Sequence, residues 1–347
     1  MGLREYIIRR LLLLIPIMFG VVILLFAVMQ FVDPGIRVTV YIRNVRQMLE
    51  VQRYIHVYGL DQPIWTQFYN WLAQIFQGNF GVSAYYREEV LHGLLARVPA
   101  TFEIVLYSVP IIIFVGIWLG VQSAVHKDKP LDHLTRIFSI LGTSLPSFFF
   151  GILLSAIFIA QLKWVTAGRI GFSSGTLLSL MIQSGTWHQY TGLLTVDSLL
   201  NGNPAFFLEA LEHLVLPAMV LVFIQTAVMV RVTRSSMLEA LSKTYITAAR
   251  AKGLSKNEVI YKHARRNALI PVVTISGLLV GGMMTGLVIT ETVFLFPGVG
   301  NWAATAAQNF DLSVVIVYAM FSAAIFVLAN LVVDVLYAYI DPRIRLG

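Results

Sequence analysis

Long apolar stretches recur along this chain and are separated by shorter polar connections. Six of them approach the roughly 20 residues that an α-helix needs to cross a bilayer. They lie at residues 11–32, 101–125, 137–160, 214–232, 269–290 and 314–340. The pattern therefore predicts an all-α polytopic membrane protein with six transmembrane helices.

The first apolar stretch follows a short basic N-terminus, an order that is also typical of a signal peptide. Its run from Leu11 to Val32 is too long for the apolar region of a signal peptide, and no small-x-small cleavage site follows it. We therefore interpret residues 1–32 as an N-terminal segment with a retained first span.

Two connections are long enough to have structure of their own. Residues 33–100 contain IWTQFYNWLAQIF, with aromatic residues at helical spacing, so we expect short amphipathic helices on the outer surface. Residues 161–213 contain apolar segments that could approach the membrane interface; a solvated loop is the alternative. Residues 101–347 then form the core, with 161–213 as an extracytoplasmic insertion and 233–268 as a cytoplasmic loop.

The composition agrees with a membrane protein, with 57% hydrophobic residues, 12% charged residues and a mean hydropathy of +0.76. The net charge of +7 lies between the spans rather than on a soluble domain, which favours lipid over nucleic acid as a partner. If the N-terminus is cytoplasmic, 17 of the 25 lysines and arginines fall on the cytoplasmic side. We therefore predict a multi-pass protein of the plasma (inner) membrane with both termini in the cytoplasm.

Small residues at four-residue spacing predict close helix contacts within the spans. The pairs are Gly116/Gly120, Gly277/Gly281 and Gly282/Gly286. Four prolines inside the expected spans predict kinks or locally unpaired backbone. These are Pro16, Pro110, Pro146 and Pro217.

Two short patterns match catalytic or nucleotide-binding motifs but lack the required surroundings. GFSSG at Gly171–Gly175 fits the nucleophile pattern, yet it follows a span rather than a strand. GVGNWA at Gly298–Ala303 has no βαβ unit around it, and no Walker A pattern occurs. The chain has no cysteine and its histidines lack metal-ligand spacing, so we expect neither a catalytic residue nor a metal site. A hydrolase that uses Ser173 is the alternative.

Acidic residues near the spans are functional candidates because an ionisable group in hydrocarbon is costly. Glu103, Glu291 and Asp311 fall near the predicted outer ends of spans, where we expect a solvated interface. Asp334 and Asn330 lie deeper in the last span, one turn apart, and we interpret them as an inward-facing structural pair. The alternative is a substrate or proton relay in an ion-coupled secondary carrier.

The segment from Ala248 to Pro271, AARAKGLSKNEVIYKHARRNALIP, carries seven basic residues, counting histidine, and a single carboxylate. Ser255 and Glu258 fit a capping box, which predicts a helix that begins after Gly253–Leu254. Upstream, SSMLEALSKTYITAARAKG predicts another helix that ends at Gly253. Its expected stripe contains Met237, Leu238, Leu241, Tyr245, Ala248 and Ala249.

These two helices present small residues at their junction. A surface of Ala248, Ala249, Ala251 and Gly253 suits docking into a groove on another protein. A basic hairpin that rests on anionic lipid is the alternative. Because small side chains anchor poorly in lipid, we favour docking.

The segment TAARAKG, Thr247–Gly253, resembles the EAA loop of ABC importer permeases. Thr247 stands where the family signature has glutamate, and Ala248, Ala249 and Gly253 match it. The sequence HARRNALIP, which ends at Pro271, resembles the peptide/nickel branch of these permeases. Similarity to the first permease of dipeptide and oligopeptide importers extends over YGLDQPIWTQFYNWLAQIFQGNFGVS, RVPATFEIV, ETVFLFPGVG and DVLYAYIDPR, with Thr166 as one departure where relatives usually have proline.

The resemblance implies a type I ABC importer permease fold and an ATP-driven importer of peptides, with oligosaccharides or nickel as alternatives. Its partners would be a second homologous permease, two ABC ATPase subunits and an extracytoplasmic substrate-binding protein. ATP and Mg²⁺ would bind to the ATPases, and this chain would hold no cofactor. The resemblance implies coupling to the ATPase through the loop 248–263, and the ATPase-coupling residues implied by the motif are Thr247, Ala248, Ala249, Gly253, Leu254, Ser255 and Glu258.

Overall fold

The computed structural model describes residues 3–340, and the regular secondary structure of this part is all helical, with no strand and one isolated bridge between Val82 and Glu89. The predicted all-α class is confirmed. The expected cytoplasmic C-terminal tail with Arg343 and Arg345 lies outside the described residues, as do Met1 and Gly2.

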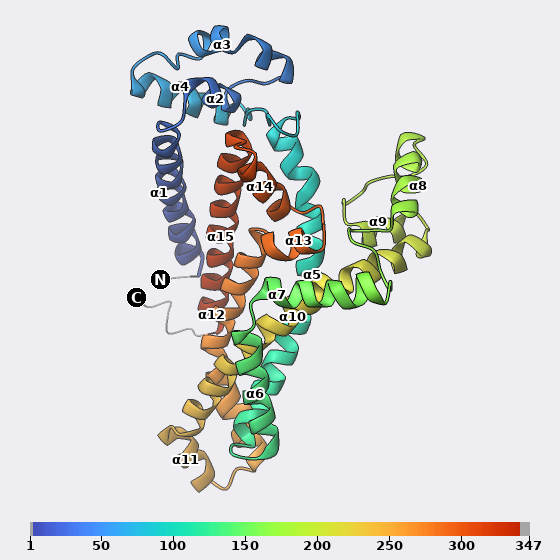
Figure 1. The fold of residues 1–347 in the computed structure, drawn as a ribbon. Helices are drawn as coiled ribbons and strands as arrows, with labels where there is room; N and C mark the ends of the chain where they lie inside the picture. The colour runs from blue at the N-terminus through green and yellow to red at the C-terminus, as the bar shows by residue number, and fades with distance from the viewer. Residues whose placement is uncertain (1–2, 341–347) are drawn as a thin grey trace.

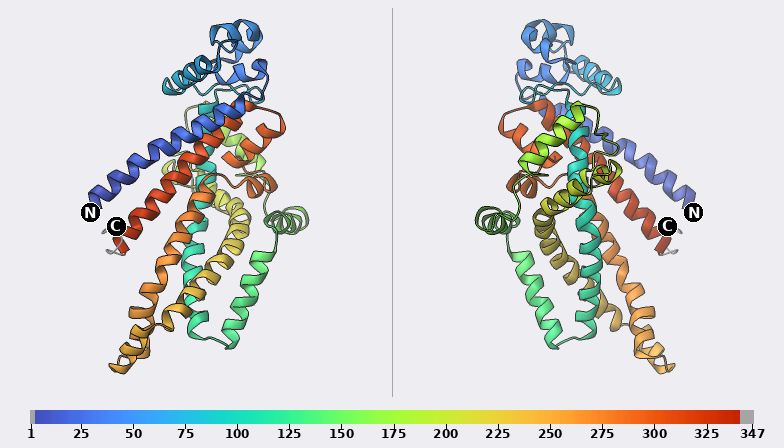
Figure 2. Two further views of the ribbon diagram at one scale, coloured as in Figure 1. Left: turned by 90° about the vertical axis from the view of Figure 1, so that its left-hand side faces the viewer. Right: turned by 90° about the vertical axis from the view of Figure 1, so that its right-hand side faces the viewer.

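Five long apolar helices could each cross a membrane, and a sixth candidate consists of a bent helix pair. The five contain α1 (Leu3–Met29), α5 (Val90–Val125), α10 (Pro204–Leu241), η4 with α12 (Glu258–Ala264 and Arg265–Met284) and α15 (Leu312–Ile340). The helices α1 and α15 lie side by side and run antiparallel (Figures 1 and 2). Both lie away from the lower part of the bundle (Figure 2).

The apolar stretch expected as one span at 137–160 is divided into two helices. Helix α6 (Pro130–Ser144) and helix α7 (Ser147–Leu154), which continues as the π-helix η3 (Ser155–Gln161), meet at an angle of 97°. The cause is Pro146, since a proline disfavours the helical conformation of the residue before it. Leu145 accordingly has ψ of 123°, and α7 lies across the bundle (Figure 1).

Residues 33–86 form a cap of short helices over one end of α1 and α15 (Figure 1). The cap is held by a core in which Trp71, Tyr41 and Ile42 pack with Phe26 and Met29 of α1. Its elements are α2 (Pro34–Arg37), η1 (Val38–Val40), η2 (Val45–Glu50), α3 (Val51–Val57) and α4 (Ile64–Phe76).

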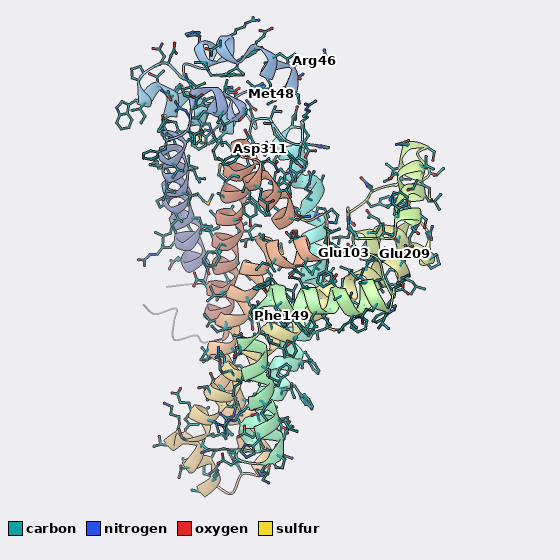
Figure 3. All side chains as sticks on the ribbon, in the orientation of Figure 1. Arg46, Met48, Glu103, Phe149, Glu209 and Asp311 are labelled. Carbon is teal, nitrogen blue, oxygen red and sulfur yellow. The ribbon has the colours of Figure 1, made fainter. Side chains whose placement is uncertain are left out.

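Residues 161–213 form a second projection, an arm that extends sideways from the bundle (Figure 1). It carries α8 (Phe172–Gln183) and α9 (Leu194–Leu200), and it leads into α10. Figure 3 places Glu103 where the arm meets the bundle, Glu209 within the arm, and Phe149 on α7. The insertion is therefore a folded unit rather than a plain loop.

Two of the three predicted glycine pairs lie at close helix contacts. A Cβ at Gly116 would overlap the Met229 side chain, and one at Gly281 would overlap Ala329, so these pairs allow α5 to approach α10 and α12 to approach α15. The predicted close helix contact at the third pair was wrong, because Gly282 faces open space and Gly286 lies beyond the end of α12. Two short helices, α13 (Val288–Val293) and α14 (Val299–Gln308), fill the connection to α15.

Candidate functional site

The basic segment forms an elbow, residues 244–264, at the end of the molecule opposite the cap (Figure 1). It consists of α11 (Thr244–Ala251), a tight turn, and the beginning of the next helix with η4. The upstream helix was predicted wrongly as separate from the span. Helix α10 instead continues without a break to Leu241, and α11 begins only after Ser242 and Lys243.

The turn of the elbow is a Schellman motif at Gly253. The Leu254 N–H donates to the Ala249 carbonyl at 3.4 Å, and the Gly253 N–H donates to the Arg250 carbonyl at 3.0 Å. Gly253 has φ of +77°, a left-handed conformation that is costly for residues with a Cβ. The sequence therefore needs glycine here for the backbone and not for space, since a Cβ would meet nothing within 4 Å.

The helix after the turn begins with the predicted capping box. The Ser255 N–H and Oγ donate to Glu258 Oε2 at 3.0 and 2.8 Å, and the Glu258 N–H donates to Ser255 Oγ at 3.3 Å. These bonds satisfy backbone donors that a helix start leaves without partners. The chain then widens into the π-helix η4, a feature that the sequence did not predict.

The inner face of the elbow is anchored in the helical bundle. Ile246, Val259 and Ile260 are buried against the ends of α5 and α10. The bundle residues in this cluster are Val121, Ala124, Met237, Ala240 and Ala268. Ala249 belongs to the same cluster and is only 7% exposed, so its expected place on the docking surface was wrong.

The outer face of the elbow is exposed and combines small and basic residues. The exposed members of the predicted coupling set are Thr247, Ala248, Gly253, Ser255 and Glu258. Leu254 is half-buried and packs against the inner cluster. Arg250, Lys252 and Lys256 surround this surface and are exposed as well. The elbow therefore has one face fixed to the bundle and one face free for a partner.

Asn330 and Asp334, the second predicted polar site, are half-buried on α15. Both line a cavity of about 430 Å³ between α1, α12 and α15. Thr274 of α12 and Pro16 of α1 line the same cavity. The role of the two residues as an inward-facing structural pair stays a prediction.

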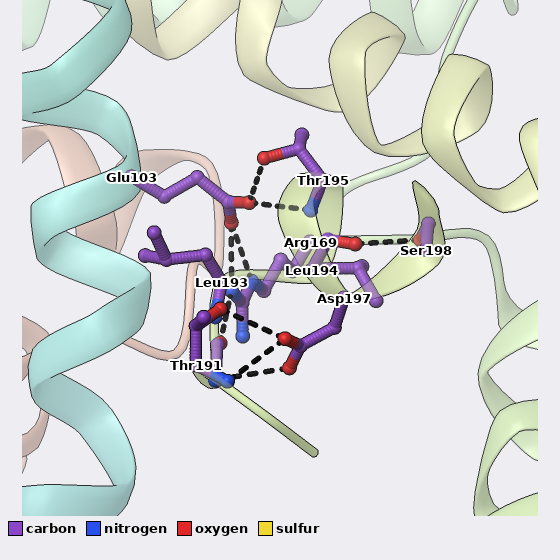
Figure 4. A network of polar contacts seen from close by, with 9 residues as sticks. Glu103, Arg169, Thr191, Leu193, Leu194, Thr195, Asp197 and Ser198 are labelled. Atoms are coloured by element: carbon purple, nitrogen blue, oxygen red, sulfur yellow. Dashed lines mark hydrogen bonds and ion pairs between the residues drawn. The ribbon is translucent and has the colours of Figure 1, made fainter. Parts of the chain in front are cut away.

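Glu103 was expected at a solvated interface, and this was wrong. Its side chain is fully buried and forms an ion pair with Arg169, Nη2 to Oε2 at 2.7 Å, while Thr195 donates to Oε1 through its N–H and Oγ1, each at 2.7 Å (Figure 4). Arg169 also donates to the Gly192 carbonyl, and Asp197 accepts from the Gly192 N–H. This network fastens the arm to α5.

Glu291 and Asp311 are also buried instead of solvated. Glu291 accepts from Thr101 Oγ1 at 2.7 Å and from the Asn301 N–H at 2.8 Å, and burial raises the pKa of its carboxyl above the usual value. Asp311 accepts from Ser83 Oγ at 2.6 Å and from the Tyr85 N–H at 3.0 Å, which ties the cap to the bundle (Figure 3). All three acids are thus structural connections between distant segments.

The two motifs that resemble catalytic or nucleotide-binding patterns both lie at the beginnings of helices. Gly171–Gly175 lies at the beginning of α8, and no strand precedes it within residues 3–340, so Ser173 lacks a nucleophile elbow. In the glycine-rich motif, Gly298 and Gly300 leave room for the Glu291 carboxylate at the start of α14. The carboxyl oxygen Oε2 accepts from the Asn301 N–H, one of the backbone donors that a helix start leaves without an intrahelical partner.

Sequence reasoning missed one further polar cluster, in which Asp132 of α6 forms an ion pair with Arg234 of α10 at 2.6 Å. The two residues are separated by 102 positions. A signal was available: Asp132 shares one helical face with Thr135, Ser139 and Gly142, while Leu134, Ile137 and Ile140 lie on the other side.

An all-helical chain with five to six candidate spans and a structured basic elbow between two of them is an integral membrane protein of a multi-pass class. The chain belongs to the family of binding-protein-dependent transport system inner membrane components, whose family model matches residues 112–346. It is therefore a permease component in the inner membrane.

Curated relatives cover nearly the whole chain. The di/tripeptide transport system permease protein DppB of Pseudomonas aeruginosa is 40% identical and the dipeptide transport system permease protein DppB of Escherichia coli K12 is 36% identical, each over 98% of both chains. The oligopeptide transport system permease protein AppB of Bacillus subtilis is 34% identical over 98% of this chain and 99% of its own.

Proposed function

We propose that this chain is the first permease subunit of an ATP-driven ABC importer of dipeptides or oligopeptides. It forms half of the translocation pathway with a second, homologous permease. The elbow lies in the cytoplasm and docks on one of two ABC ATPase subunits, and an extracytoplasmic substrate-binding protein delivers the peptide. ATP and Mg²⁺ bind to the ATPases, and this chain holds no cofactor and no catalytic residue.

The observation that supports the proposal best is the two-faced elbow. Its inner face packs on α5 and α10, so a displacement of the elbow is passed on to the bundle. Its outer face has small side chains that allow close approach and basic side chains that suit an acidic groove. ATP binding closes the ATPase dimer, moves the elbow as a lever and shifts the bundle between inward-open and outward-open states.

Peptide is proposed as the substrate class because the relatives are named as dipeptide, di/tripeptide and oligopeptide permeases. The partner binding protein tests this assignment directly. Purified from its native host, it should carry a short peptide that mass spectrometry identifies; an oligosaccharide or nickel in its place would contradict the substrate class and leave the importer role intact.

The importer role is tested with the complete complex in proteoliposomes that contain ATP. Wild-type complex should accumulate substrate only with hydrolysable ATP. Ala248→Arg, on the exposed face of α11, should remove ATPase association and uptake because a large cation replaces a small contact. Ala307→Arg on α14 is the matched control, an exposed helical alanine outside the elbow, and should leave both unchanged. Uptake by this chain alone, driven by an ion gradient, would overturn the proposal in favour of a secondary carrier.

A further inference from the structure

Helix α6 is built with its polar and small residues inward. Asp132, Thr135, Ser139 and Gly142 are its buried residues, spaced so that they form one stripe. Leu134, Ile137 and Ile140 on the other side are each more than half exposed. Toward the bundle, helix α6 therefore presents mainly polar and small residues, and the half-buried Phe138 adds one ring contact with Phe223 of α10. Its attachment depends largely on polar contacts and close backbone packing.

The polar contacts gather at the beginning of α6. Asp132 is fully buried, and its Oδ1 accepts from Arg234 Nε at 2.6 Å while its Oδ2 accepts from Arg234 Nη2 at 2.9 Å. Ser123 Oγ at the end of α5 donates to Asp132 Oδ1 at 2.5 Å and accepts from Thr135 Oγ1 at 2.8 Å. Asp132 thereby joins three helices, α5, α6 and α10, through bonds that an apolar side chain could not make.

Close packing continues along α6 from this cluster. A Cβ at Gly142 would overlap the Ala227 methyl group of α10, and one at Gly120 of α5 would overlap Thr233 of α10. Helices α5 and α6 thus each approach α10 closely near the ion pair. Such contacts have few alternative arrangements and resist sliding.

The cluster lies directly beside the elbow. Arg234 precedes Met237 by three residues on α10, and Met237 is a fully buried member of the core beneath the elbow. Ser123 likewise lies between Val121 and Ala124 of α5, which belong to the same core. The elbow touches α5 and α10, whereas α6 is reached through Asp132.

We propose that Asp132 and Arg234 are positioning residues that clamp α6 to α5 and α10, so that a displacement of the elbow moves all three helices as one rigid unit. The inference rests on the proposed role of the elbow as the contact for the ATPases. The pair does not touch substrate or nucleotide. Its effect is on coupling, the amount of substrate moved for each ATP hydrolysed.

The first test is Asp132→Asn in the complete reconstituted complex. ATPase association and ATP hydrolysis should persist, while substrate uptake per ATP falls by at least about tenfold, because α6 no longer follows the elbow. Lys243→Gln is the control; it removes the exposed pair with Glu239 near the elbow and should leave coupling unchanged. Full coupling in Asp132→Asn overturns the inference, whereas absence of ATP-dependent uptake in the wild-type complex overturns the proposed function itself.

The second test does not require removal of the ion pair's carboxylate. The natural chain has no cysteine, so the double variant Ser123→Cys/Thr135→Cys introduces one unique pair at the α5–α6 contact. Oxidation should cross-link the pair and leave uptake within about twofold of the reduced form of the same variant, because a rigid unit does not need this contact to open. Loss of uptake on oxidation with recovery on reduction would show that α6 moves against α5 and would overturn the proposal, as would failure of the pair to cross-link.

Discussion

Single residues determine this structure where the backbone conformation or a buried charge permits few other residue types. Gly253 supplies the left-handed turn of the elbow, and Glu103, Glu291, Asp311 and Asp132 each join segments that are far apart in sequence. The glycine was predictable, because its requirement is local. The contacts of Glu103, Glu291 and Asp311 were not, because a carboxylate near a span end has the same sequence pattern whether it is solvated or buried against a distant segment.

Gly253 gives a sharp prediction. Gly253→Val should reduce ATP-dependent uptake severalfold, because a non-glycine residue in the left-handed conformation costs about 1–2 kcal/mol and a β-branched residue costs more. Gly253→Asn should stay close to wild type, since asparagine tolerates this conformation and the site has room for a side chain. Uptake in proteoliposomes measures both. Equal loss in the two variants would mean that the side chain, not the backbone, matters at this position.

Glu291 predicts a pH dependence of stability. Burial raises the pKa of its carboxyl in the folded protein, so the folded state holds the proton at pH values where the unfolded state has released it. The free energy of unfolding should therefore fall as the pH rises from the ordinary glutamate pKa through the raised one, and it should level off above.

The measurement is thermal unfolding in detergent from about pH 4 to about pH 8 for wild type and Glu291→Gln. Wild type should lose stability relative to the glutamine variant as the pH rises. A constant offset between the two over this range would contradict the raised pKa, since glutamine has no proton to release.

Helices and their ends were predictable where they depend on sequence patterns within a few neighbouring residues. The long apolar helices, the helix stop at Gly253 and the Ser255–Glu258 cap all follow from short-range patterns, and the structure contains each of them. The extent of α10 was not predictable, because the break at Ser242–Lys243 competes with a helical pattern on both sides. The 97° bend at Pro146 was underestimated as a kink, since how far a proline turns a chain depends on what α7 packs against.

The elbow cap gives a prediction at this scale. Ser255→Ala removes the acceptor for the Glu258 N–H and a donor to its carboxylate, and the helix start should fray. Backbone amides of residues 256–264 should exchange with deuterium about fivefold faster, as expected for a lost helix cap. Ser242→Ala, outside the cap, is the control. Unchanged exchange in Ser255→Ala would show that packing on α5 and α10 alone orders the elbow.

At the scale of the whole molecule, the bundle carries two large additions, the cap and the arm, each fastened by a buried acid. Asp311 holds the cap segment around Ser83, and Glu103 holds the arm through Arg169 and Thr195. The sequence indicated that the cap and the arm have structure of their own. It did not indicate which residues attach either of them to the bundle. Attachments between segments 66 to 228 residues apart depend on the tertiary fold, which no local pattern records.

The attachment of the arm can be dissected with a double-mutant cycle. Arg169→Met leaves the fully buried Glu103 carboxylate without its cation, and loss of one partner of a buried pair costs about 3–5 kcal/mol. The arm should then open locally, which limited proteolysis at Lys163, a cleavage site that every variant keeps, would detect as faster cleavage. Adding Glu103→Gln removes the unpaired charge and keeps an acceptor for Thr195, so the double variant should recover much of the lost protection. If the single and double variants were cleaved at the same rate, the ion pair would not be what holds the arm, and apolar packing of Val165 against Leu154 and Phe294 would be the main attachment instead.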